Sequence, residues 1–490
     1  MFREVLSGLP KDPLFEADLS KIGMEVTPTE QFVRIGEPDE FFKFRSDQKT
    51  QDFQAVSHVN EVRREAFHEC VRNEVIKRLS DQNIASLYLP QLTTEQPSEA
   101  HIPILCTAPE ILRHKHNVIV VVGESVQDLA IWAYRIVGHA GGMDEGSAVG
   151  LAKKLQAWQD VKSENEVLGT DELMIKAGNV TKAEAYRSAG SDKNIRSQPL
   201  DGTPTQNSKS ATTEDDEENA AKTSNNPSDN NTPGLIILNP GQPLYSPALN
   251  KAMSITTWQT RPRPSAGSGW IQIDEEHNKV NGHRSPREHI ANVMRTVVCN
   301  GEIVHPDSNL FMVGIGDGGD VLLEWLDTHF IARSLGSTKS YIGTRLDAIV
   351  LIDSLHKPAS ITDPALKPFL AARGRSYVLS TEKQGKELKM PILPAPMRPT
   401  FSCYKDKDIE AIVQAMGRMH ATSGTEEEKN TLATRIDSMS ATPGAEGFER
   451  SVYEYDSVSC ATYASGEEET TELIWPKVMD DVLSWFKGFT

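Results

Sequence analysis

The feature that most constrains this chain is the stretch Phe311–Trp325, FMVGIGDGGDVLLEW, in which an apolar run passes through closely spaced glycines. The pattern predicts a buried strand, a tight glycine turn and then a helix. Gly314, Gly316 and Gly318 keep the spacing of the G-x-S-x-G nucleophile elbow. The middle position is Gly316, which has no side chain to attack a carbonyl. The stretch therefore predicts the geometry of an elbow without its nucleophile.

Other apolar runs predict that this strand belongs to a mostly parallel sheet. Asn117–Gly123 (NVIVVVG) is a continuous β-branched run, as expected for a strand buried on both faces. Further strands are predicted at Ile84–Leu89, Ile102–Cys106, Gly234–Leu238, Leu310–Val313, Leu346–Ile352, Ser376–Leu379 and Ser457–Tyr463. Helices are predicted at Ser57–Asp81, Val126–Val137, Ser147–Trp158, Pro286–Cys299, Gly319–Phe330 and Pro476–Phe486. This alternation is typical of an α/β fold with helices on both faces of the sheet.

Composition divides the chain into one large domain and several polar segments. Residues 1–56 read as an irregular lead-in with one strand, Glu40–Arg45, and residues 57–490 as a single domain. Residues 188–232 and about 422–449 have too few large apolar residues to fold, so we expect disordered insertions there. The acidic cluster Glu214–Glu218 lies in the first insertion. It is either a solvated surface segment or a tether for a basic partner.

The overall charge and the cysteines limit the partners and the compartment. The net charge of −18 argues against broad nucleic-acid binding, which needs many Lys and Arg residues, and favours protein partners. The five cysteines are scattered, with no C-x-x-C pair, as expected in a reducing compartment. We see no hydrophobic signal core and no apolar run of about 18 residues, so we expect a soluble intracellular chain without a membrane segment. No H-E-x-x-H or other ligand spacing predicts a metal, and no motif predicts a cofactor.

A search for a catalytic set gives an incomplete one. In α/β-hydrolases the chain order is nucleophile, acid and histidine. The nucleophile place is Gly316, and the acid could be Asp353 or Glu382, each of which follows a predicted strand. The histidine should lie in the last loop, Ala464–Leu473 (ASGEEETTEL), which contains none. Without nucleophile and general base, hydrolysis by this route is not expected.

Two other groups of residues keep an enzymatic alternative open. Ser125 follows a buried strand within Gly123-Glu124-Ser125, but the closing glycine of an elbow is missing there. An esterase that uses Ser125 as its nucleophile is therefore the alternative to a non-catalytic protein. If Ser125 has no catalytic role, we expect it to be a turn residue or a helix N-cap. His356 follows the strand Leu346–Ile352 and could pair with Asp353, or be an ordinary loop histidine. Asp317, next to Gly316, would line the same pocket.

The segment Asn239–Trp270 combines aromatic and basic residues and could be a recognition loop. Asn239 and Gly241 directly follow a predicted strand, where α/β folds place their ligands. Trp258, Arg261 and Arg263 follow, and the two arginines could contact a phosphate or an acidic peptide. The alternatives are an siRNA-binding module and a proline-rich surface loop without a ligand.

Together these segments resemble the fungal Argonaute-binding protein family, specifically its second subunit in the Argonaute siRNA chaperone complex. A similar domain is found at the C-terminus of fungal class II histone deacetylases, and an animal branch acts in nuclear RNA regulation. The resemblance runs in family order through NVIVVVGESVQDLAIWAYR (117–135), GLIILNPGQPLYSP (234–247), KAMSITTWQTRPRPSA (251–266), LFMVGIGDGGDVLLEWLD (310–327), LDAIVLIDSLH (346–356), GRSYVLSTEKQG (374–385) and YASGEEETTELIWPK (463–477).

The resemblance implies an α/β-hydrolase relative whose catalytic set is vestigial. In the animal branch the elbow carries a serine and the final loop a histidine; here the matching places are Gly316 and, within a residue, Thr471. Glu382 stands where the acid could be. The resemblance therefore implies a scaffold rather than an enzyme. Its partners would be Argonaute or a chromatin-silencing complex, with siRNA associated indirectly. The resemblance implies a role in heterochromatin silencing and a location in the nucleus, with the cytoplasm as a second location.

Overall fold

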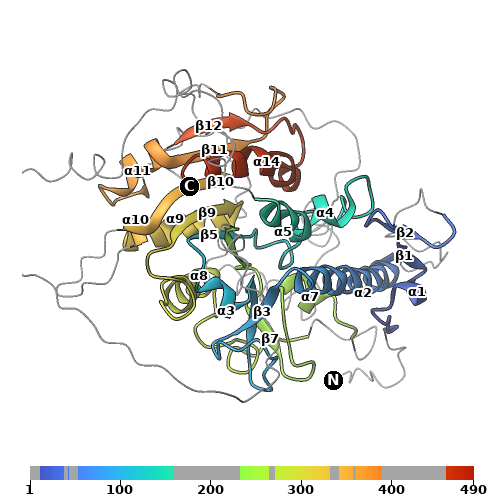
Figure 1. The fold of residues 1–490 in the computed structure, drawn as a ribbon. Coiled ribbons are helices and arrows are strands. Elements are labelled where there is room, and N and C mark those ends of the chain that lie inside the picture. The colour runs from blue at the N-terminus through green and yellow to red at the C-terminus, as the bar shows by residue number, and fades with distance from the viewer. Residues whose placement is uncertain are drawn as a thin grey trace, which may run out of the picture.

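A central eight-stranded sheet organises the protein (Figure 1). The structure is a computed structural model and describes residues 12–37, 42, 53–158, 232–263, 271–330, 342–356, 360–388 and 460–490. The strands are β3 (Ile84–Leu89), β4 (Ile102–Thr107), β5 (Asn117–Val122), β6 (Gly234–Leu238), β9 (Asn309–Ile315), β10 (Leu346–Ile352), β11 (Gly374–Val378) and β12 (Ala461–Ala464). Their order is β12-β11-β10-β9-β5-β6-β4-β3, and β4 alone runs against its neighbours in this sheet.

Helices cover both faces of the sheet, because successive side chains of a strand point to opposite sides. Ile119 and Val121 of β5 belong to one hydrophobic core, and Val118, Val120 and Val122 belong to the other. The first core is closed by α2 (Phe53–Ser80), α5 (Ala148–Gln156) and α14 (Ile474–Lys487). The second is closed by α3 (Pro109–Leu112), α8 (Pro286–Val293), the π-helical turn Met294–Val298, α9 (Asp317–His329), α10 (Ile342–Arg345) and α11 (Leu366–Arg373). The predicted α/β class, with a mostly parallel sheet between two helical layers, is confirmed.

The helix predicted at Val126–Val137 is wrong. This segment forms a series of turns after β5, and Ala130 has a left-handed backbone with φ 64°. Its backbone bonds go to the residues around α4 (Gly142–Gly146) instead of along a helix: the Trp132 N–H donates to the Gly146 carbonyl at 2.9 Å. The apolar spacing that suggested a helix buries Leu129, Ile131 and Trp132 all the same, since turns can place side chains on one face as well.

The N-terminal segment is more ordered than the predicted irregular lead-in. Residues 12–37 contain α1 (Leu19–Ile22), β1 (Met24–Val26) and β2 (Phe32–Arg34), and the two strands pair with each other. The Phe32 ring lies edge-on to Phe67 of α2, with centroids 5.9 Å apart, and is fully buried. This segment is therefore part of the domain's core.

Two smaller elements complete the described fold, and several predictions fall outside it. β7 (Leu244–Ser246) and β8 (Lys251–Met253) form a hairpin followed by α7 (Ile255–Gln259). The second polar insertion and nearly all of the first, the acidic cluster Glu214–Glu218 and most of the predicted strand Glu40–Arg45 lie outside the described residues. Within the described parts, no helix is both long and apolar enough to cross a membrane.

Candidate functional site

The predicted elbow is a sharp turn between β9 and α9 at the carboxyl edge of the sheet. Gly316 has φ 53° and ψ −132°, a backbone conformation that glycine adopts without strain. The flanking glycines are required by close packing: a Cβ on Gly318 would lie 2.1 Å from the Gly123 carbonyl oxygen, and one on Gly314 would lie 2.5 Å from Cα of Gly319. The turn is thus held against the loop that follows β5.

Glu124 occupies the space that a side chain at the elbow would need. A Cβ on Gly316 would lie 3.0 Å from Cγ and 3.1 Å from Oε1 of Glu124. Glu124 was not among the predicted site residues, although its neighbours Gly123 and Ser125 were. Its proximity to Gly316 arises because β5 and β9 are parallel neighbours and both end at this edge.

Carboxylates from three other segments surround Glu124. Burial, followed by the charges of Asp317, Asp353 and Glu472, raises the pKa of Glu124 to about 8. Asp317 begins α9, Asp353 follows β10 in a left-handed conformation with φ 47°, and Glu472 lies in the turn Thr471–Leu473. Four acidic side chains therefore crowd one edge of the sheet.

Two of the neighbouring carboxylates, Asp317 and Glu472, also have structural partners. Asp317 Oδ1 accepts a hydrogen bond from the Ser125 N–H at 2.9 Å. Glu472 accepts one from the Gln127 side-chain amide at 2.9 Å and pairs with Arg135. Within the described residues, no group of three or more His, Cys, Asp or Glu side chains has a geometry that could hold a metal ion.

His356 bonds to Ser354 rather than to Asp353, the predicted partner. Its Nδ1 lies 3.1 Å from Ser354 Oγ, and this hydroxyl donates to Asp320 Oδ1 at 2.6 Å. Burial lowers the pKa of His356 to about 4, so the ring is neutral near pH 7, and its Nε2 is buried without a hydrogen-bond partner. This Asp–Ser–His chain therefore joins the first turn of α9 to the loop after β10.

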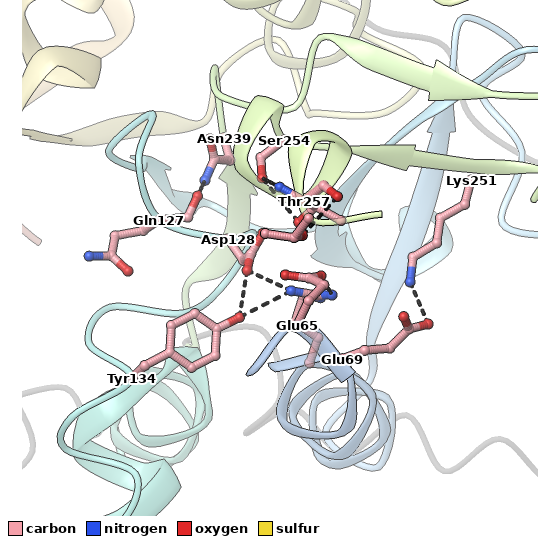
Figure 2. A network of polar contacts seen from close by, with 11 residues as sticks. Glu65, Glu69, Gln127, Asp128, Tyr134, Asn239, Lys251, Ser254 and Thr257 are labelled. Carbon is pink, nitrogen blue, oxygen red and sulfur yellow. Dashed lines mark hydrogen bonds and ion pairs between the residues drawn. The ribbon is translucent and has the colours of Figure 1, made fainter. Parts of the chain in front are cut away.

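The predicted residues Asn239 and Gly241 shape the loop that carries Glu124. The Asn239 side-chain amide donates to the carbonyls of Glu124 and Gln127, and its oxygen accepts the Gly241 N–H at 2.6 Å. A Cβ on Gly241 would lie 1.9 Å from the Ser125 carbonyl oxygen, so only glycine fits. Figure 2 shows Asn239 joined to Gln127 beside a second, larger set of polar contacts.

That larger set is a buried network between α2 and the loop after β5 (Figure 2). Arg72 of α2 donates to Asp128 Oδ2 at 2.7 Å and also pairs with Glu65. The Tyr134 hydroxyl donates to the same Asp128 oxygen at 2.5 Å. Burial opposes ionisation of Asp128, but the Arg72 charge and the Tyr134 hydroxyl outweigh it and lower the pKa of Asp128. The network ties the loop after β5 to α2, the longest helix among the described residues.

Several residues of the predicted recognition loop, Asn239–Trp270, make contacts within the protein. Trp258 is buried, and its indole N–H donates to the Ile271 carbonyl at 2.9 Å. The Arg261 guanidinium lies over the Trp258 ring, 4.7 Å from the centroid. Arg263 binds the buried Asp12 through its backbone N–H at 2.7 Å and its Nε at 3.0 Å. Arg263 thus anchors the N-terminal segment.

The two remaining predicted positions, Glu382 and Thr471, lie in different environments. Glu382 is exposed and pairs with Lys386 at 2.7 Å. Thr471 begins the turn in which the following residue, Glu472, approaches the elbow. The structure therefore brings Gly123, Ser125, Asn239, Gly241, Gly316, Asp317 and Asp353 to one edge, together with Glu124 and Glu472.

Comparison with known proteins places these features in one family. The family model described as the Arb2 domain matches residues 15–196 and 218–384, which is most of the chain. The match spans the elbow and β5, β6, β9, β10 and β11, while the last resembling segment, residues 463–477, lies beyond it. Neither the curated proteins nor the solved structures gave a match. The chain belongs to the Arb2 domain family, as its resemblance to Argonaute-binding proteins predicted.

Proposed function

We propose that this protein is a non-catalytic scaffold with an α/β-hydrolase-type fold that binds protein partners in siRNA-guided heterochromatin silencing. The observation that carries the proposal is the elbow at Gly316, which has no nucleophile and is filled by Glu124. Family membership supports an Argonaute-linked setting. The sheet order, with one reversed strand next to an edge and the elbow at the central β9, supports the hydrolase-type fold.

The site chemistry supports a binding role over hydrolysis. A serine nucleophile needs a base within hydrogen-bond reach to take its proton. Ser125 Oγ is buried and has no hydrogen-bond partner. The acidic groups that act on Glu124 beside the elbow are Asp317, Asp353 and Glu472, and their negative charges would oppose an oxyanion forming there. These features support a repurposed pocket.

Partner capture tests the proposal directly. The tagged protein is purified from its native host, and the bound proteins are identified by mass spectrometry. We expect an Argonaute protein, or a histone deacetylase complex, together with a nuclear location of the tagged chain. Recovery of neither partner from nuclear and whole-cell extracts would contradict the silencing role.

A broad fluorophosphonate probe tests the esterase alternative separately. We expect no labelling of the native protein. Labelling that disappears in Ser125→Ala, but persists in Ser354→Ala, would identify Ser125 as a nucleophile and overturn the non-catalytic assignment.

The siRNA-binding alternative has its own test. Direct binding through phosphates would weaken steeply with salt, since each phosphate contact releases counterions. We expect no salt-dependent binding of duplex siRNA by the purified protein, given its net charge of −18 and the use of Arg263 to hold Asp12. Binding that falls steeply with salt and is lost in Arg261→Ala would contradict this expectation.

A further inference from the structure

We propose that Glu124 is a carboxyl latch: as the neutral acid it fills the space over Gly316 and keeps the loop 123–127 closed on the sheet edge, and its ionisation opens this loop. The inference concerns the internal mechanics of the elbow and goes beyond the proposed scaffold role. It rests on the position of Glu124 among the carboxylates that converge on it.

The geometry makes Glu124 a contact between separate parts of the fold. Its side chain lies against the turn that joins β9 to α9, about 3 Å from where a Cβ of Gly316 would stand. The loop carrying it is fixed on its other side by the Asn239 side-chain amide, which donates to the Glu124 carbonyl at 3.2 Å. Opening of this loop would therefore uncover the elbow.

The groups that face Glu124 from the surrounding elements are acidic. Asp317 faces it from the start of α9, Asp353 from the loop after β10, and Glu472 from the turn before α14. Among the described contacts, Arg135 pairs with Glu472, and no cation is among the groups that shift the pKa of Glu124. An ionised Glu124 would therefore be repelled by three carboxylates, whereas a neutral one is not.

Asp320 and His356 form the next layer around these carboxylates. Burial raises the pKa of Asp320 to about 6, against the hydrogen bonds from Ser354 and Leu355. Asp317 adds to this increase. His356 is connected to Asp320 by two hydrogen bonds through the Ser354 hydroxyl, and its ring is neutral at pH 7. Neither group supplies a positive charge that would stabilise an ionised Glu124 near neutral pH.

The direction of the pH effect follows from linkage. The pKa of Glu124 is about 8 in the closed form, against an ordinary value of 4.5 when the loop is open. Between these values the closed form binds more protons than the open form, so closure weakens as pH rises. The equilibrium constant for opening should rise about tenfold per pH unit in this window and level off above about pH 8.

Hydrogen exchange of the full-length protein tests the latch. Exchange of peptides that cover residues 123–137 is measured from pH 5.5 to 9, with the intrinsic pH dependence of exchange removed. We expect protection to fall as pH rises and to become flat above about pH 8. Glu124→Gln, which cannot ionise, should keep the loop protected across the whole range. Exposed Glu324 of α9, which pairs with Arg287, supplies the matched control Glu324→Gln, and its profile should follow the native one.

A second variant keeps the test decisive if Glu124→Gln folds poorly. Asp317→Asn removes the carboxylate that acts most strongly on Glu124 but retains an oxygen that can accept the Ser125 N–H. It should move the pH at which protection levels off to a lower value. A native pH profile in Glu124→Gln, or an unmoved level-off point in Asp317→Asn, would overturn the latch. Partner capture plays no part in this readout, so failure of the latch and failure of the scaffold role are distinguishable.

Discussion

At the residue scale, the absence of a side chain at Gly316 is linked to the position of the Glu124 side chain. The Glu124 side chain fills the space that Gly316 leaves free. The two residues are close because Glu124 follows β5, Gly316 follows β9, and these strands are parallel neighbours. Sequence patterns identified Gly316 because the spacing of its glycines is local. Glu124 could not be identified in this way, because its role depends on a residue far along the chain.

This relation predicts the outcome of restoring the nucleophile. Gly316→Ser should remain unreactive towards a fluorophosphonate probe, since a serine there would lie against Glu124 and the carboxylates around it, whose negative charges oppose a developing oxyanion. It should also lower stability by about 1–3 kcal/mol, the usual range for a non-glycine residue held at a strained backbone position. Thermal unfolding and gel labelling measure the two effects. Efficient labelling of Gly316→Ser would show that a base is within reach after all.

At the scale of elements, the contact between α2 and the loop after β5 depends on buried charge. Arg72 is almost fully buried and serves two carboxylates, Asp128 and Glu65. Arg72→Ala should destabilise the protein by about 3–5 kcal/mol, because it leaves buried carboxylates uncompensated. Chemical denaturation gives the free energy of unfolding.

The same helix offers a matched control. Lys251 pairs with Glu69 of α2 at 2.6 Å, but both side chains are about one-third exposed (Figure 2). Lys251→Ala should therefore cost less than about 1 kcal/mol. Equal losses for the two variants would show that the Arg72 network does not fasten the loop.

Most elements were predictable from local patterns, and the exception shows the limit of those patterns. Buried β-branched runs such as β5 and β10 identify strands because both faces of the sheet are covered. The segment Val126–Val137 has helical spacing, yet it forms turns because Asp128 and Tyr134 bind Arg72 and its backbone pairs with residues near α4. Such tertiary contacts are not visible in a local window. For the same reason, the sequence predicted that the candidate site lies at the carboxyl edge of the sheet but did not identify Glu124 as part of it.

At the scale of the whole molecule, buried histidines should limit stability in acid. Burial lowers the pKa values of His68 and His289 to about 3 and those of His283 and His356 to about 4, from an ordinary 6.5. Below pH 6.5 the unfolded chain binds these protons first, so stability falls as pH decreases. Glu124 acts in the other direction, because its raised pKa lowers stability as pH rises towards 8. Thermal unfolding from pH 4 to 9 should show greatest stability near pH 6.5.

A histidine variant separates these contributions. His283 and His289 lie in contact, with their Nδ1 atoms 2.8 Å apart, and both are buried. His289→Gln should reduce the loss of stability between pH 6.5 and 4, whereas His277→Gln, at an exposed histidine, should not. An unchanged acid limb in His289→Gln would assign the loss to other groups.

The shared space at the elbow also sets a rule for how this family can change over evolution. A Cβ at position 316 would come within 3.0–3.1 Å of Glu124 side-chain atoms, so a residue larger than glycine there requires the Glu124 side chain to shift. Relatives with a serine at the elbow should carry a shorter residue at the place of Glu124. A side chain at position 316 would thus be accommodated more easily when a second substitution in the loop after β5 shortens the residue at position 124.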